Sequence, residues 1–215
     1  MTTPEMATTM KPNLVPGPDL LILSPEFYMR PLTREDATDR YTSWFNDPEL
    51  QKILGRPVRN WTNEQAADHI AKFNYTTDIH LGIFPIGEDL PVGYMTITVR
   101  PNKSASMIVA YGEPEYRNIQ ALRPFQGQFM KFFFYELGMR KMVGNVHEKN
   151  KASMAICNYF GFKLDGILRE HYREKDGSFA NERVYSLLKS DWIEHVQNMD
   201  PELLASLNIP KEDFQ

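Results

Sequence analysis

Cysteine, long apolar runs and surplus positive charge are all scarce in this chain of 215 residues. Its single cysteine, Cys157, cannot form an internal disulfide, and a chain of this length can bury a sufficient core without one. We therefore expect a reducing, cytoplasmic setting. No stretch approaches the roughly 18 consecutive apolar residues of a membrane span, and the first residues lack the pattern of a secretion signal, so no membrane partner is expected.

The charged residues also exclude some partners. The formal net charge is -4, which gives no electrostatic reason to expect nucleic acid as a partner. The 5 histidines show no metal-ligand spacing, so we expect no metal. With 42% hydrophobic residues the chain has the composition of a globular protein, and its length fits one domain.

The ends of the chain differ from its middle. Residues 1–19 are rich in proline and threonine and hold few large apolar groups, so they bury too little to offset their ordering entropy. We expect a flexible N-terminal arm over 1–19, one domain over 20–195 and a C-terminal extension over 196–215.

Apolar periodicity and turn residues predict an α/β (α+β) domain in which helices flank a mixed, mainly antiparallel sheet. A capping box at Thr33 and Asp36 starts a first helix, which 46–48 is expected to end. The most distinct helix is predicted over 122–137, where phenylalanines share one broad face before Gly138. The other expected helices are 62–73 and 151–160, and the expected strands are 20–32, 79–86, 92–99, 105–111, 141–147, 162–172 and 182–188.

Three stretches carry a family signature. They are YMRPL at 28–32 with REDA at 34–37, VAYGEPEYR at 109–117, and NKASMAICNYFGF at 150–162 followed by VYSL at 184–187 and Trp192. Together they resemble the GCN5-related N-acetyltransferase (GNAT) superfamily, and more narrowly its ribosomal-protein alanine acetyltransferase branch. The resemblance covers about residues 26 to 192, and the predicted element order agrees with it independently.

The resemblance implies that the fourth and fifth strands splay apart and that an acyl-coenzyme A, most simply acetyl-CoA, lies between them as co-substrate. Backbone N–H groups of the splayed strand would pair with the pantetheine amides and polarise the thioester carbonyl. The pyrophosphate would lie at the start of the long helix, where N–H groups favour anions. The cofactor-binding residues so implied are Ile108, Val109, Ala110, Arg117, Asn118, Ile119, Gln120, Ala121, Leu122, Arg123 and Asn150, and Tyr159 would be the general acid for the departing thiolate.

The match has two departures. Gln120 and Leu122 occupy positions where relatives carry small residues that let the backbone approach the pyrophosphate, so the loop is degenerate. Ser106 stands where relatives often carry a glutamate that deprotonates the amine. An amine with a pKa near 10.4 must lose a proton before attack, so another base is needed. The candidates are Glu113, Glu115, His147 and Glu170, and Glu113 is the preferred one.

The acceptor is expected to be a primary amine, either of a small molecule or of a protein N-terminus. Trp44 and Phe45 on the first helix and Tyr172 on the last hairpin are the expected acceptor-binding residues, because aromatic side chains stack on cations and rings. Two alternatives stay open: a binding or regulatory protein that has lost catalysis, and a transferase whose donor is a carrier protein or a longer acyl chain. The protein could form a homodimer.

Two site residues have plainer explanations. Tyr159 lies in an apolar helix and could serve only in packing. Asn150 precedes a helix and could act as its N-cap, which is compatible with a cofactor contact.

Overall fold

The computed structural model of this chain describes residues 22–23, 26–118, 122, 125–174 and 176–210. These residues form one mixed sheet of eight strands in the order β1-β2-β3-β4-β5-β6-β8-β7. Neighbouring strands are antiparallel except β5 and β6, which run parallel. The strands are β1 (Ile22–Leu23), β2 (Phe27–Pro31), β3 (Asp78–Pro85), β4 (Gly93–Val99), β5 (Ser104–Tyr111), β6 (Lys141–His147), β7 (Lys163–Arg173) and β8 (Phe179–Leu188).

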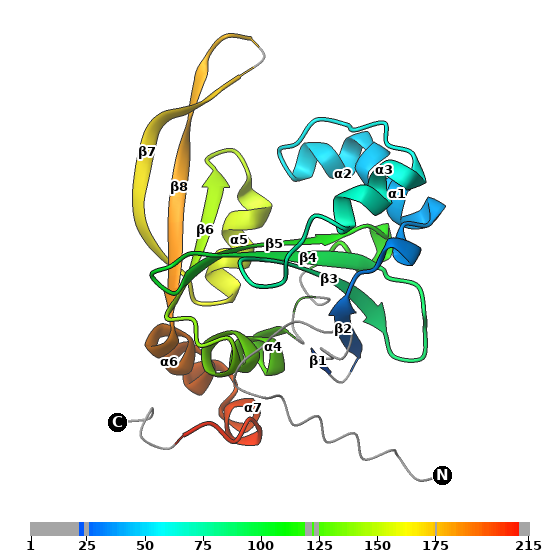
Figure 1. Cartoon of the computed structure of the whole chain (residues 1–215). Coiled ribbons are helices and arrows are strands. Elements are labelled where there is room, and N and C mark those ends of the chain that lie inside the picture. The colour runs from blue at the N-terminus through cyan, green and yellow to red at the C-terminus, as the bar shows by residue number, and fades with distance from the viewer. Residues whose placement is uncertain (1–21, 24–25, 119–121, 123–124, 175, 211–215) are drawn as a thin grey trace.

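Helices lie on both faces of the sheet (Figure 1). The upper face, as we call it, carries α1 (Asp39–Asn46), α2 (Pro48–Ile53) and α3 (Asn63–Ile70). The lower face carries α4 (Gln128–Lys131), a π-helix (Phe132–Glu136), α5 (Lys151–Tyr159), α6 (Lys189–Met199) and α7 (Pro201–Ser206). Short 3-10 turns occupy Arg34–Asp36 and Pro114–Tyr116.

Side-chain alternation along the strands divides the core into two main clusters. In β4, Tyr94 belongs to the upper cluster with the side chains of α1 and α3, whereas Met95 and Ile97 belong to the lower cluster. In β5, Ala110 lies in the upper cluster and Tyr111 in the lower one. The sheet is therefore buried on both faces where α1 and α3 cover it.

Local sequence explains where the first helices begin. The Thr38 side chain accepts a hydrogen bond from the backbone N–H of Tyr41 and caps α1. Asp47 caps α2 in the same way, with Pro48 at the first helical position. The expectation that 46–48 ends the first helix is confirmed, because α1 ends at Asn46. The start of α2 at the same residues was not predicted from the sequence.

The long helix expected over 122–137 also differs. Phe125 and Gln126 are in 3-10 conformation, and the α-helix begins at Gln128. It continues as a π-helix, in which the N–H of Leu137 donates to the carbonyl of Phe132 at 2.9 Å. The wider turn accompanies three consecutive buried phenylalanines at 132–134.

The described part of the C-terminal segment, residues 196–210, packs against the lower cluster. The boundary expected at 195 falls inside α6. Val196, Leu204 and Leu207 are almost fully buried in the lower cluster. The N-terminal arm expected over 1–19 lies outside the described residues. The mixed α/β fold itself is confirmed.

Candidate functional site

The parallel pair β5 and β6 parts halfway along its length. β5 pairs with β4 from Ala105 to Tyr111. Its pairing with β6 covers only 104–106 against 141–143. Beyond that point β5 continues to Tyr111 and β6 continues to His147, so the two strands form a wedge (Figure 1).

Strand geometry shows which backbone groups face this wedge. The N–H of Arg100 donates to the carbonyl of Ser104, and the N–H of Gly112 donates to that of Val92. Even-numbered residues of β5 therefore direct their N–H and C=O groups to β4, and odd-numbered residues direct theirs away from it. Of the expected cofactor residues 108–110, only Val109 presents its N–H to the wedge. The register does not favour the backbone contacts expected from Ile108 and Ala110, because their N–H groups face β4.

The expected acid, Tyr159, lies on the lower side of the sheet. Val109 and Tyr159 are both partly buried against the lower cluster. Tyr159 is the last residue of α5, and its carbonyl accepts hydrogen bonds from Gln126 Nε2 at 2.7 Å and from His195 Nε2 at 2.8 Å. These contacts fix the end of α5 beside the lower cluster. The role of Tyr159 as general acid stays a prediction.

Asn150 lies between β6 and α5. Its side chain accepts a hydrogen bond from the backbone N–H of Ser153 at 3.0 Å and caps the helix. The structure therefore bears out the capping role, and cofactor contact stays a prediction beside it.

The expected pyrophosphate loop is described only in part. Four of its residues lie outside the described ranges: Ile119, Gln120, Ala121 and Arg123. The prediction that the loop is degenerate is therefore not tested. Asn118 is exposed, and its side chain donates to the carbonyl of Glu115. Leu122 is buried in the lower cluster, so it acts as a core residue. The expected role of these residues at the pyrophosphate stays a prediction.

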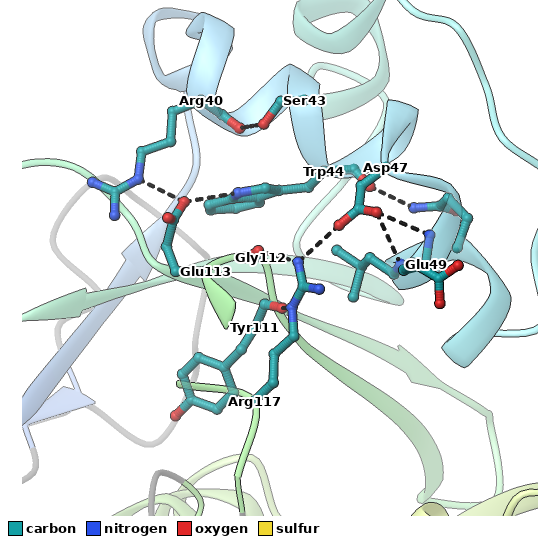
Figure 2. A network of polar contacts seen from close by, with 11 residues as sticks. Arg40, Ser43, Trp44, Asp47, Glu49, Tyr111, Gly112, Glu113 and Arg117 are labelled. Atoms are coloured by element: carbon teal, nitrogen blue, oxygen red, sulfur yellow. Dashed lines mark hydrogen bonds and ion pairs between the residues drawn. The ribbon is translucent and has the colours of Figure 1, made fainter. Parts of the chain in front are cut away.

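Arg117 is engaged by the protein itself (Figure 2). Its guanidinium donates to the carbonyls of Tyr111 and Gly112 at the end of β5. It also pairs with the Asp47 carboxylate at 2.9 Å. Burial alone would raise the pKa of Asp47, but the Arg117 bond and the two backbone N–H groups of α2 lower it. Arg117 thus joins β5 to the start of α2, with its charge already neutralised.

Glu113 accepts two hydrogen bonds on one carboxylate oxygen (Figure 2). Arg40 Nε donates at 2.8 Å and Trp44 Nε1 at 3.1 Å. Burial alone would raise the pKa of Glu113, but these two donors lower it below its usual value. A carboxylate with a lowered pKa is a weak base, so this geometry argues against the preferred catalytic role.

The expected acceptor-binding aromatics on α1 are core residues. Trp44 is 2% exposed and Phe45 is 3% exposed, so neither offers surface to a ligand. The Trp44 ring lies directly over Gly112, where an added Cβ would come within 1.9 Å of it. Only glycine fits there. The expected stacking of Trp44 and Phe45 on the acceptor does not fit this burial, because both rings pack inside the upper cluster.

Tyr172 is placed differently. It lies on β7, partly buried, and its hydroxyl donates to Glu182 at 2.5 Å. Burial and the neighbouring carboxylate raise the pKa of Tyr172 to about 12. Sequence reasoning missed Glu182, because a lone acid in a strand is normally a solvated side chain.

The other candidate bases are Glu115, Glu170 and His147. Glu115 and Glu170 are exposed. His147, at the end of β6, has Nε2 3.2 Å from Glu174. Among the described residues, no group of three histidine, cysteine or acidic side chains is placed to hold a metal ion.

Comparisons with known proteins agree with this fold. The family model for the acetyltransferase (GNAT) domain matches residues 26–163. No curated protein matches the chain. A GCN5-related N-acetyltransferase from Brucella melitensis is similar in structure, with a TM-score of 0.68 and 18% identity over 90% of this chain and 89% of that one.

Two proteins with stated acceptors are also similar in structure. One is described as a candidate ribosomal-protein-serine acetyltransferase from Vibrio cholerae, with a TM-score of 0.62 and 16% identity over 80% of this chain and 98% of that one. The other is a spermidine N-acetyltransferase chimera from Vibrio cholerae and hSSAT, with a TM-score of 0.62 and 16% identity over 78% and 98%. At this identity the likeness shows the fold alone. Within the described ranges, every helix is too short or too polar to cross a bilayer.

Proposed function

This chain belongs to the GNAT acetyltransferase family, and from that premise we propose that it is a cytoplasmic, acetyl-CoA-dependent N-acetyltransferase. The acceptor we propose is a primary amine, of a small molecule or of a protein N-terminus. The observation that carries the proposal is the wedge between β5 and β6, which opens after the pair Ser106 and Val143.

The wedge suits an acyl-CoA because β5 keeps its strand geometry after β6 has left it. The Val109 N–H can then donate a hydrogen bond to a carbonyl oxygen of the ligand, either of an amide or of the thioester, as it would to a neighbouring strand. A donor fixed in the protein stabilises the negative charge that develops on that oxygen during attack, without reorganising. The side chains of Met107 and Val109 pack against the lower cluster, so the lower side of β5 is apolar here.

Acyl transfer needs two proton movements. The amine nitrogen bonds to the thioester carbon and loses a proton, the carbon–sulfur bond breaks, and the departing thiolate gains a proton. We assign the second step to the Tyr159 hydroxyl, at the C-terminal end of α5. For the first step, the engaged Glu113 is a weak candidate, and we assign it the positioning of α1 against β5 instead.

The proposal is tested by thiol release from acetyl-CoA over a panel of primary amines that includes spermidine and a serine-initiated peptide amide. We expect turnover with at least one amine and a product heavier by one acetyl group. Tyr159→Phe should lower kcat about 100-fold and leave the Kd of acetyl-CoA unchanged. Tyr135→Phe, on the π-helix of the lower face, is the matched control and should leave kcat unchanged.

Two negative results have different meanings. A rise in Tm with acetyl-CoA but no turnover would favour a binding protein that has lost catalysis. If acetyl-CoA changes neither Tm nor turnover, the proposed donor is wrong.

A further inference from the structure

A buried carboxylate lies next to the wedge on the upper face. The Glu182 side chain is 4% exposed. One carboxylate oxygen accepts from the Tyr172 hydroxyl at 2.5 Å, and the other accepts from Asn145 Nδ2 at 2.7 Å. Both donors are neutral, and no lysine or arginine among the residues that the structure describes forms an ion pair with this carboxylate.

The charge of Glu182 is thus only weakly compensated. Among the described residues, the cationic partner found for it is His171, whose Nε2 lies 3.7 Å away on a side chain 47% exposed and which is charged only when protonated. A buried charge is costly unless it is paired. A bound cation would complete the pairing that the protein itself leaves unfinished.

The two donors present acceptor oxygens to such a cation. Tyr172 uses its hydroxyl proton on Glu182, which leaves the lone pairs of its oxygen. Asn145 uses its amide N–H on the same carboxylate, which leaves its amide oxygen, and Asn145 is exposed. The buried Glu182 therefore orients two neutral side chains so that both offer oxygen atoms.

Strand register places this group beside the wedge. Ser106 pairs with Val143, and Val143 pairs with Ser186, so these side chains share one face. Alternation then puts Ile108, Asn145 and Glu182 on that same face. It is the upper face, because Ala110 lies there in the cluster with α1 and α3. Ile108, 37% exposed, marks the part of β5 that the helices leave uncovered.

A bulge in β7 aims Tyr172 at Glu182. The register between β7 and β8 shifts between Leu168 and Tyr172, and Glu170 within the shift has φ +51°, which is unfavourable for a residue other than glycine. Asn181 holds the bulge, because its side-chain oxygen accepts the Glu170 N–H at 2.9 Å. Glu148 holds Asn181 in turn, at 2.8 Å and 2.9 Å.

We propose that Tyr172 and Asn145, oriented by Glu182, bind the ammonium group of the acceptor amine on the upper side of the wedge. The inference rests on the proposed function, which it deepens by placing the acceptor. Tyr172 and Asn145 touch the acceptor, and Glu182 is a positioning residue that acts through them. His147, whose ring centroid lies 4.8 Å from that of Tyr172, borders the same place from β6.

The test compares binding of a charged and an uncharged peptide. A serine-initiated tetrapeptide amide and its N-acetylated form are titrated calorimetrically into protein saturated with CoA. Wild type should prefer the free amine about tenfold or more, because hydrogen bonds to a charged group are the stronger ones. Glu182→Gln should abolish this preference and raise KM for the amine about tenfold, with KM for acetyl-CoA unchanged. Glu194→Gln, on α6 with a side chain 71% exposed, is the matched control and should change neither.

Further variants keep the test decisive. If Glu182→Gln does not fold, Asn145→Ala and Tyr172→Phe, both with Glu182 intact, should each lower the preference for the free amine. The inference would be overturned if these variants preferred the free amine over the N-acetylated peptide as strongly as wild type does. It would also be overturned if the CoA-loaded wild type did not bind the free amine. A Tm rise with acetyl-CoA would still stand in that case, so failure of the acceptor site is distinguishable from failure of the proposed donor.

Discussion

Single side chains in this protein take their roles from partners far away in the sequence. Glu113 was the preferred candidate for the base that the acceptor amine needs, because Ser106 stands where relatives often carry a glutamate. Its actual partners, Arg40 and Trp44, are 73 and 69 residues away. Local pattern could not show these contacts, so the burial and engagement of Glu113 were beyond prediction. The same holds for Arg117, which pairs with Asp47 across 70 residues.

Substitution of Glu113 separates the two roles. Glu113→Gln should lower the free energy of unfolding by about 1 to 3 kcal/mol, because it weakens a charge-assisted bond to Arg40 and leaves a partly buried guanidinium without its counter-charge. It should lower kcat less than tenfold. Urea unfolding and steady-state kinetics measure both, with the exposed Glu115→Gln as control for stability. A kcat loss of 100-fold at unchanged stability would restore Glu113 as the base.

The buried His80 makes stability depend on pH. It is fully buried between Tyr41 Oη at 2.8 Å and Thr96 Oγ1 at 3.0 Å. Burial, with smaller contributions from nearby His69 and Arg56, lowers its pKa from 6.5 to about 3. The unfolded chain therefore binds a proton below pH 6.5 that the folded protein refuses until about pH 3. The contribution of the neutral His80 to the free energy of unfolding is fully present above pH 6.5 and is lost as the pH falls below that value.

From pH 7.5 to pH 5, His80 alone should lower the free energy of unfolding by about 2 kcal/mol. Burial also lowers the pKa of His69 to about 4, which acts in the same direction. Urea unfolding at the two pH values measures the loss. His80→Phe should be less stable at pH 7.5 and should lose less on acidification, because phenylalanine does not titrate. An acid loss as large as in wild type would contradict this explanation.

Secondary-structure elements were predictable where periodicity is strong and neighbours agree with it. The strand expected over 141–147 is β6 with the same bounds, and the helix expected over 151–160 is α5 to within one residue. The helix end expected at 46–48 is confirmed by α1, but the start of α2 at the same residues was not predicted, although Asp-Pro-Glu is also typical of a helix start. Beyond 195 the burial of Leu204 and Leu207 was not predicted, because it comes from tertiary packing.

Asp47 serves two elements at once, and two substitutions tell them apart. Asp47→Asn keeps a good N-cap for α2 and loses the charge facing Arg117, so it should cost less than about 1 kcal/mol. Asp47→Ala loses both and should cost about 1 to 2 kcal/mol. Thermal unfolding of both variants measures the difference. Equal losses would show that the cap contributes nothing at this position.

The molecule is organised around the parting of β5 and β6. The upper and lower clusters pack against the two faces of the sheet. The wedge opens between β5 and β6, which are the only parallel pair among the described strands. The family resemblance alone predicted this splay. The residue pattern of β5 and β6 could not predict it, since a strand that has parted from its neighbour has the same periodicity as a paired one. Which N–H faces the opening followed only from the register.

Residue-resolved amide hydrogen exchange by NMR, with and without saturating acetyl-CoA, tests that geometry most directly. The Val109 amide should exchange quickly in the free protein and slow at least tenfold with acetyl-CoA, since its N–H faces the wedge. Its neighbours Ile108 and Ala110 bond to β4 and should exchange slowly in both states. A Val109 amide that is equally protected with and without acetyl-CoA would contradict a donor site between β5 and β6.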